Sequence, residues 1–584
     1  MDIPRYALMI ALALVGWMLL VEWNGFQQQH RASAPPPTIE RVQPETPVAG
    51  TIADGTGSDD LPGTVPTELP QLESTIPPVA DSSAAASTSS AKESGAIQIH
   101  TDTLSLEISL LGGDIIAASL PRYHAELGRT DLPFQLLLQS PARNYTAQSG
   151  LIGPNGTDTA ETRPVFTALR NASTLENGQK SLTVDLLHTT ADGVRITKRF
   201  RLDRGAYVVD MEYLIDNKSA KPWEAALFGQ LRRDNSADPS AAGGALGIQP
   251  FVGFATRTEE EPYLKHDFDS LEEEPYKAQT TDGWIALVQH YFISAWIPSA
   301  SQTNSYQMLR SQSGQNIGRF TSPAVTLQPG ASGIMSARFY AGPKDQYRLV
   351  KIAPGLELTV DYGWLWWIAQ PLFALLYFFA TGHLNAFGVD INIAHGIANW
   401  GVAIILLTVL VKAVFFQLSA ASYKSMAKMR KLQPKMLELR ERYGDDRQKL
   451  SQETMDLYRK EKVNPLGGCL PILIQMPVFL SLYWVLLESV ELRQAPLAGW
   501  IKDLSVMDPY FVLPLLMGAS MYYQQTLNPP PPDPMQAKVM QFMPIIFTVF
   551  FLFFPAGLVL YWLVNNALSI AQQWVITRQI ERGT

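Results

Sequence analysis

Long apolar runs between residues 362 and 577 constrain the fold of this 584-residue chain more than any other feature. Five of them are about as long as a bilayer-spanning α-helix, which needs roughly 20 predominantly apolar residues. They lie at 400–417, 469–487, 510–527, 539–554 and 557–576. Residues 1–350 are mixed and polar by comparison. The sequence therefore predicts a polytopic helical membrane protein that carries a large soluble insert.

Another apolar run, Tyr6–Trp23, lies near the start of the chain. Its apolar core is longer than that of a usual signal peptide, and the nearest small-x-small site, Ala32-Ser33-Ala34, lies too far downstream for ordinary cleavage. We therefore expect residues 1–23 to be an uncleaved transmembrane anchor, with a signal peptide as the alternative. Residues 24–95 are rich in Pro, Ser, Thr and Ala, a composition that predicts a flexible linker.

Residues 96–345 show short alternating stretches between Gly, Asn, Asp and Pro, such as "SLTVDLL", "VRITKRFRL" and "AYVVDMEYLI". This pattern predicts a large β-sandwich. We find no catalytic motif in the region and interpret the acidic stretch Leu271–Tyr276 as a solvated loop. Five histidines are spaced unlike metal ligands, and we interpret them as structural or surface residues: His100, His124, His188, His266 and His290. We expect no metal and no cofactor.

Charge and cysteine content exclude further classes of protein. A net charge of −8 argues against a chain whose whole surface binds nucleic acid, and we expect no DNA partner. The single cysteine, Cys469, excludes an intrachain disulfide and a multi-cysteine metal site. We interpret Cys469 as a small apolar residue.

The apolar run at 362–380 decides the topology. If it crossed the membrane, residues 419–462, which hold twelve Lys and Arg, would lie on the same side as the β domain, and the positive-inside rule disfavours that arrangement. Three tryptophans and a central proline instead fit a helix at the membrane interface: Trp364, Trp366, Trp367 and Pro371. We therefore expect an interfacial amphipathic helix and connector at 346–399, a five-helix core at 400–577 and a short cytoplasmic tail at 578–584.

Six spans then remain, counting the N-terminal anchor. Both termini and the basic segment fall in the cytoplasm. The β domain falls outside the inner membrane, in the periplasm of a Gram-negative cell.

The basic segment at 420–462 is expected to form a cytoplasmic helical hairpin that turns at residues 444–446. Its first arm carries methionines at roughly helical spacing together with basic residues: Met426, Met429, Arg430, Lys431 and Lys435. Such a hairpin fits two interpretations. It anchors the protein to anionic lipid, or it is a docking platform on which adaptable Met side chains and cations meet a partner.

Polar side chains recur inside the expected spans. Lys412 is the one charge within "AIILLTVLVKAVFFQL" (403–418), and a charge at mid-membrane usually faces a protein interior or water. Helical geometry places Thr408 one turn from it. The candidate site residues on these spans are Lys412, Thr408, Gln475, Ser520, Gln524, Tyr561, Trp562 and Asn565. For the uncharged residues, the alternative role is hydrogen bonding between helices. For Lys412, the alternative is that the side chain snorkels, so that its ammonium reaches the membrane interface.

Several long motifs resemble one family. "NPLGGCLPILIQMPVFLSLYWVL" (464–486), "MAKMRKLQPK" (426–435) and "DPMQAKVMQFMPIIFTVFFLFFPAGLVLYWLVNN" (533–566) are similar to the bacterial YidC membrane protein insertases, and the layout resembles their Gram-negative form. The resemblance implies a hydrophilic groove open to the cytoplasm and the lipid but closed toward the periplasm. It also implies a supersandwich-like β domain. A groove residue that is usually Arg matches Lys412, which keeps the charge but not bidentate geometry.

The resemblance and the topology together predict an insertase of the bacterial inner membrane rather than an enzyme. The expected partners are nascent membrane proteins, the Sec translocon, phospholipid and, through the hairpin, the ribosome. A solute transporter or channel is the alternative, although the sequence lacks the broken helices and paired ionisable groups typical of one. A membrane-tethered carbohydrate enzyme acting through the β domain is a second alternative.

Overall fold

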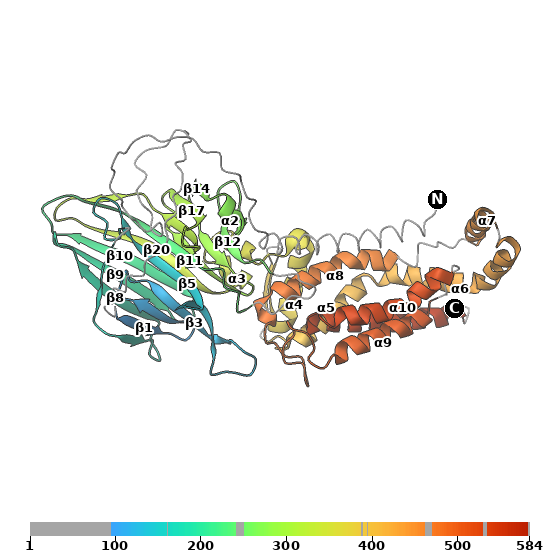
Figure 1. Cartoon of the computed structure of the whole chain (residues 1–584). Coiled ribbons are helices and arrows are strands. Elements are labelled where there is room, and N and C mark those ends of the chain that lie inside the picture. The colour runs from blue at the N-terminus through green and yellow to red at the C-terminus, as the bar shows by residue number, and fades with distance from the viewer. Residues whose placement is uncertain are drawn as a thin grey trace, which may run out of the picture. The chain divides into compact units, whose positions relative to one another are not determined.

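The computed structural model describes residues 95–159, 162–240, 250–386, 389–393, 395–444, 446–461, 470–528 and 534–581 (Figure 1). The expected anchor at 1–23, Cys469 and nearly all of the expected linker at 24–95 lie outside the described residues.

Two large antiparallel sheets form the first described part of the chain. The eleven-stranded sheet has the order β14-β17-β18-β11-β5-β4-β3-β2-β1-β7, with β19 paired beside β11 and β7 parallel to β1. Its strands are β1 (Ala96–His100), β2 (Ser105–Ser109), β3 (Ile115–His124), β4 (Pro133–Ser140), β5 (Arg143–Ile152), β7 (Ala172–Thr174), β11 (Trp223–Arg233), β14 (Tyr276–Thr280), β17 (Asn304–Arg310), β18 (Asn316–Thr321) and β19 (Val325–Leu327).

The nine-stranded sheet has the order β13-β12-β15-β16-β20-β10-β9-β8-β6. Its strands are β6 (Thr167–Ala168), β8 (Ser181–Thr189), β9 (Val194–Asp203), β10 (Val208–Asn217), β12 (Gly253–Thr256), β13 (Leu264–Asp267), β15 (Ile285–Val288), β16 (Phe292–Pro298) and β20 (Ser332–Pro343). A four-residue helix, α2 (Ser270–Glu273), covers the first half of the stretch 271–276 that the sequence indicates as an acidic loop, and β14 begins at its last residue.

The inner faces of the two sheets pack against each other. Every second residue of β10 is buried, as the period-two pattern of its sequence requires. Polar contacts also cross between the sheets, since the indole N–H of Trp296 on β16 donates to the carbonyl oxygen of Gln230 on β11 at 3.1 Å. A side chain at Gly229 would lie 2.9 Å from the Trp296 ring, so glycine permits this close approach. The predicted β-sandwich is confirmed.

The second described part of the chain is helical. Its longer helices are α4 (Trp366–Thr381), α5 (Trp400–Val414), α6 (Phe416–Tyr443), α7 (Arg447–Lys460), α8 (Leu470–Glu488), α9 (Val512–Thr526), α10 (Pro534–Phe551) and α11 (Ala556–Glu581). Short elements connect them: α3 (Gln346–Leu349), η2 (Leu356–Thr359), η3 (Gly363–Leu365), β21 (His383–Ala386), β22 (Val389–Asn392) and η5 (Val490–Leu492).

Local chemistry fixes the helix ends. The side chain of Asn399 caps α5 by accepting from the N–H of Val402 at 3.0 Å. Gly382 ends α4 at φ +81°, a backbone conformation that glycine adopts without strain. Asp446 caps α7 by accepting from the N–H groups of Gln448 and Lys449. The turn between α6 and α7 therefore lies where the sequence indicates it.

Helices α5 and α6 meet at a bend of 66° after Val414. The expected first core span, 400–417, is therefore a shorter helix followed by a change of direction. A side chain of α11 stabilises the bend, because the amide of Gln572 donates to the carbonyl oxygen of Phe416 at 3.0 Å.

Among the described residues, Gly363–Thr381 is a helix long and apolar enough to cross a membrane by itself, and α5 with α6 also passes that test as a bent pair. The tryptophans that open the 363–381 helix are 60–74 % exposed. Its interfacial placement stays a prediction that rests on the distribution of basic residues.

Candidate functional site

Lys412 lies in the last turn of α5 and is half-buried. Its Nζ donates to the hydroxyl of Ser569 on α11 at 2.7 Å, and that hydroxyl donates to the carbonyl oxygen of Asn565 at 2.7 Å. A cation in the last turn of a helix is also stabilised by the helix dipole. The ammonium therefore points toward α11 and has a neutral hydroxyl partner.

Gln475 joins α8 to the same face of α11. Its amide donates to the Tyr561 hydroxyl at 3.3 Å and to the side-chain oxygen of Asn565. Tyr561 is 1 % exposed and Asn565 is 8 % exposed. We name Lys412, Gln475, Tyr561, Asn565 and Ser569 the α11 polar cluster, since it connects three helices through one face of α11.

Ser520 belongs to a second polar contact. Its hydroxyl accepts from the amide of Asn566 at 3.1 Å, which joins α9 to α11. Gln524 is half-buried one turn further along α9. The sequence analysis missed Asn566 because adjacent helical residues point about 100° apart, so it faces α9 while Asn565 faces α8.

Two predicted groove residues contact apolar or backbone groups instead. Thr408 is fully buried, and its hydroxyl donates to the carbonyl oxygen of Ile404 on its own helix at 2.7 Å. Trp562 packs edge-on against Phe479 with ring centroids 4.7 Å apart, and it also stacks with Phe547. In this state neither side chain takes part in the α11 polar cluster.

The hairpin helices pack through a small set of contacts. Lys435 on α6 forms an ion pair with Glu461 at 2.7 Å, and the Tyr458 hydroxyl donates to the sulfur of Met436 at 3.2 Å. Four further predicted docking residues lie on α6. Met426 and Met429 are half-buried, and Arg430 and Lys431 are exposed.

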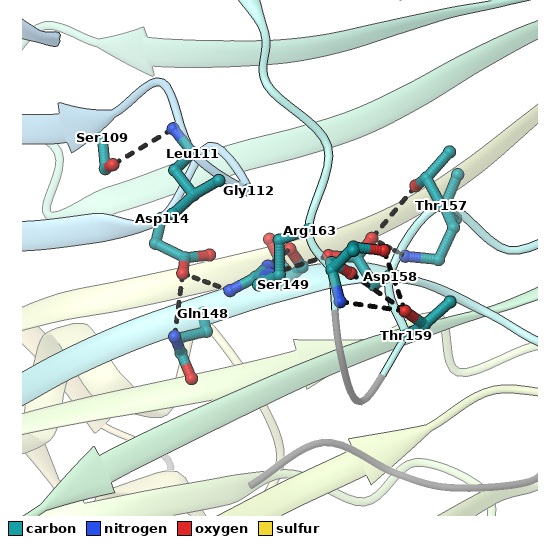
Figure 2. Close-up of polar contacts among 12 residues, drawn as sticks. Ser109, Leu111, Gly112, Asp114, Gln148, Ser149, Thr157, Asp158, Thr159 and Arg163 are labelled. Atoms are coloured by element: carbon teal, nitrogen blue, oxygen red, sulfur yellow. Dashed lines mark hydrogen bonds and ion pairs between the residues drawn. The ribbon is translucent and has the colours of Figure 1, made fainter. Parts of the chain in front are cut away.

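A charged cluster in the β domain bears on the enzyme alternative (Figure 2). The guanidinium of Arg163 pairs with Asp114 and, at 2.8 Å, with Asp158. Lys198 is fully buried and donates to the carbonyl oxygen of Gly112 at 2.9 Å. Because Arg163 holds both carboxylates, we interpret the cluster as a structural cross-link rather than as an acid–base pair. Among the described residues no group of His, Cys, Asp or Glu is arranged to hold a metal ion.

The fold and the site together define a class of membrane protein. A large β-sandwich is followed by a set of apolar helices that face one another through polar side chains, and no catalytic or metal constellation is found in the part of the chain that the structure describes. This arrangement defines a membrane protein whose polar side chains within the apolar helices face the protein interior.

Comparisons with known proteins identify the family. The family model described as the YidC periplasmic domain matches residues 96–375, and the model described as the 60Kd inner membrane protein matches residues 392–583. The membrane protein insertase YidC of Stutzerimonas stutzeri is 50% identical over 584 residues, covering 100% of this chain and 99% of the relative. That of Cellvibrio japonicus is 51% identical over 590 residues, with coverage of 100% and 99%.

A crystal structure described as an active YidC insertase with its first transmembrane domain resolved is also similar, at 17% identity and a TM-score of 0.38, covering 82% of this chain and 92% of that chain. The chain belongs to the YidC family of membrane protein insertases. It is a bacterial inner membrane protein with a periplasmic domain, and its function is membrane protein insertion. The transporter alternative is not supported by these relatives.

Proposed function

We propose that the α11 polar cluster lines a hydrated groove through which short polar segments of nascent membrane proteins enter the bilayer. The observation that carries this proposal is the half-buried ammonium of Lys412, which has a neutral hydroxyl as its partner. A cation in that setting attracts an acidic group on an entering segment. The apolar part of the client moves into lipid at the same time, and no covalent step is needed.

The shortness of two core helices supports a lowered free-energy barrier for a client's polar segment that crosses the bilayer at this site. Helices α5 and α9 have 15 residues each, which corresponds to about 22 Å at 1.5 Å per residue. The hydrocarbon core of a typical bilayer is about 30 Å thick, so short spans favour local thinning of the membrane. A client's polar segment then crosses a shorter apolar distance, part of it beside the side chains of the cluster.

Lipid contact is supported by the outer faces of α9 and α10. Their large apolar side chains are 48–60 % exposed and include Leu515, Leu516, Tyr522, Val539, Ile545, Ile546 and Val549. Exposed apolar surface of this kind is stable in a bilayer rather than in water.

The proposal includes the full topology: six spans, both termini in the cytoplasm, the interfacial helix at 346–399 and the five-helix core at 400–577. The expected domains at 1–23, 24–95, 96–345 and 578–584 remain part of it. We also propose that the hairpin at 420–462 meets partners in the cytoplasm, with the ribosome as one of them, and that the core works both with and without the Sec translocon. The exposed cations of α6 support that role.

Site-specific crosslinking tests the groove. A photoreactive residue at 475, in the α11 polar cluster, should form adducts with a stalled nascent membrane protein that has a short acidic tail. The matched control is the same photoreactive residue at 545 on α10, where the native side chain is 60 % exposed. We expect adducts with the polar tail at 475 and adducts with the apolar segment or lipid at 545. Tail adducts at 545 alone would refute the groove.

A further inference from the structure

The C-terminal end of α8 is covered by the β domain. Its last residue, Glu488, is 4 % exposed, and its carboxylate lies 2.7 Å from the Nζ of Lys344, which is 3 % exposed. Lys344 directly follows β20, and its backbone N–H donates to the carbonyl oxygen of Tyr291 at 2.9 Å. This buried ion pair therefore joins the helical core to a backbone position fixed by the β-sandwich.

A neutral histidine completes the helix end. The ring Nε2 of His290 lies 2.9 Å from the carbonyl oxygen of Leu487, and His290 is 1 % exposed. Burial and the nearby Lys344 charge lower the pKa of His290 to about 4, so at physiological pH the neutral ring donates its Nε2–H to that carbonyl. The last four carbonyls of a helix have no partner within the helix. The β domain therefore supplies a hydrogen-bond donor to a carbonyl oxygen for which α8 itself has no donor.

The segment after α8 is attached to the same domain. The guanidinium of Arg493 donates to the carbonyl oxygen of His124 at 2.7 Å and lies 5.5 Å from the ring centroid of Phe134 on β4. The contacts on both sides of η5 thus come from β-domain residues. The end of α8 is therefore fixed by contacts with the β domain and is not a free helix end.

The opposite half of α8 carries a residue of the groove. Gln475 precedes Glu488 by 13 positions, which places it about 20 Å away along the helix axis. Its amide meets Tyr561 and Asn565 on α11. Pro477 removes one backbone hydrogen bond near Gln475, but α8 is a continuous helix from Leu470 to Glu488, so the position of one end constrains the other.

We propose that Lys344 and Glu488 are a positioning pair: through them the β domain holds α8 so that Gln475 meets α11 in the groove. The proposal rests on the proposed function of the α11 polar cluster and adds that the β domain acts on it. Neither residue is assigned contact with the client. Both act through the placement of α8.

The energetics of buried charge provide the test. Removal of one partner leaves an uncompensated charge in the interior, whereas replacement of both by apolar side chains of similar volume is often tolerated. Lys344→Met and Glu488→Leu should each be harmful, and the double variant should be close to the parent. Lys344→Arg keeps the charge and should retain function.

The readout is geometric as well as functional. In a Cys469→Ser background, cysteines at 475 and 565 report the contact between α8 and α11 through the yield of disulfide crosslinking. We expect each single variant to lower this yield several-fold. In protein that keeps Gln475 and Asn565, each single variant should also lower the insertion of an acidic-tailed client several-fold at equal protein level. The double variant should restore both. Arg199→Met is the control, since it removes a partly exposed ion pair with Asp185 in the same domain.

Three results would overturn the proposal. They are an unchanged crosslinking yield in the single variants, the absence of rescue in both the double variant and Lys344→Arg, and an equal effect of Arg199→Met. A failure of the groove itself is distinguishable, because the crosslinking yield would then follow the ion pair while client insertion would not.

Discussion

At the scale of single residues, the ammonium of Lys412 is the feature that most needs a physical reason. A charged side chain at the centre of a membrane helix costs about 2.5–3.5 kcal/mol on insertion scales, and this value is an upper bound for Lys412, which lies in the last turn of α5. The hydroxyl of Ser569 and the end of the α5 dipole offset part of the cost. The attraction between Lys412 and a client carboxylate 4 Å away is about 1–4 kcal/mol for effective dielectrics between water and a protein surface. Such an attraction biases entry without trapping the client.

Substitution of Lys412 tests whether its charge works in the groove. Lys412→Arg should retain insertion, Lys412→Ala should lose much of it for clients with acidic tails, and Lys412→Glu should be worst because it repels those tails. The measurement is insertion of a Sec-independent client at matched protein level. A client with a neutral tail is the control and should depend less on the charge. Equal insertion by all three variants would leave Lys412 as a snorkelling anchor.

Lys198 makes the stability of the β domain depend on pH. Burial lowers the pKa of its amine from 10.5 to about 7, so the folded protein loses the proton near pH 7 while the unfolded chain keeps it to about pH 10. Unfolding therefore takes up a proton between these values, and stability rises with pH across that window. Lys198→Met should remove this rise.

The measurement is the unfolding temperature of both proteins in detergent between about pH 7 and pH 9.5. We expect the wild type to gain a few degrees relative to Lys198→Met across this range. Lys265, which is part-exposed and pairs with Asp361, gives the control variant Lys265→Met. Parallel pH profiles of wild type and Lys198→Met would show that the amine does not titrate in this window.

Sequence reasoning reached some of these residues and not others. Tyr561, Asn565 and Gln475 were all candidates from the sequence, and the first two contact the third. Asn566 was missed because its partner on α9 is set by tertiary packing. Thr408 shares a stripe with Lys412, but a threonine in a helix also bonds to the carbonyl four residues back, and that local bond forms here.

At the scale of elements, period-two alternation predicted the long strands well because their inner faces are buried. The break between α5 and α6 was not predictable, since residues 412–418 contain neither Pro nor Gly. It depends on a contact from a distant helix, the bond from Gln572 to the Phe416 carbonyl.

The hairpin can be shortened where its two helices meet. Lys435 and Glu461 form an ion pair, so residues 435 and 461 lie close enough to be bridged by a short Gly/Ser linker. Deletion of 436–460 removes α7 and the end of α6 but keeps the predicted docking residues of the first arm. It should leave the helical core folded but lower insertion several-fold, because the remaining arm no longer has α7 packed against it. Arg430→Gln with Lys431→Gln, which removes charge from the docking residues themselves, is the companion variant. Normal insertion by both variants would contradict a docking role of the hairpin.

At the scale of the whole molecule, the order of domains was predictable because the β region and the helical region differ in composition and period. The junction between them was not, because Lys344 and Glu488 are 144 residues apart and neither lies in a recognisable motif. Pairing across such a separation is decided by the assembled fold. The sides of the membrane on which the parts lie follow instead from the distribution of charge.

Cysteine labelling decides the topology. In a Cys469→Ser background, Asn392→Cys before α5 and Gln448→Cys on α7 are both exposed positions. If the 363–381 helix lies at the interface, position 392 should react with an impermeant maleimide in intact spheroplasts, and position 448 should react only after the membrane is opened. The twelve Lys and Arg at 419–462 would then lie in the cytoplasm, as the positive-inside rule favours.

If the 363–381 helix crosses the membrane, positions 392 and 448 exchange sides. Labelling of both from outside would mean that α5 does not cross. A cysteine at an exposed strand position such as Thr183 on β8 reports the periplasmic side in every case.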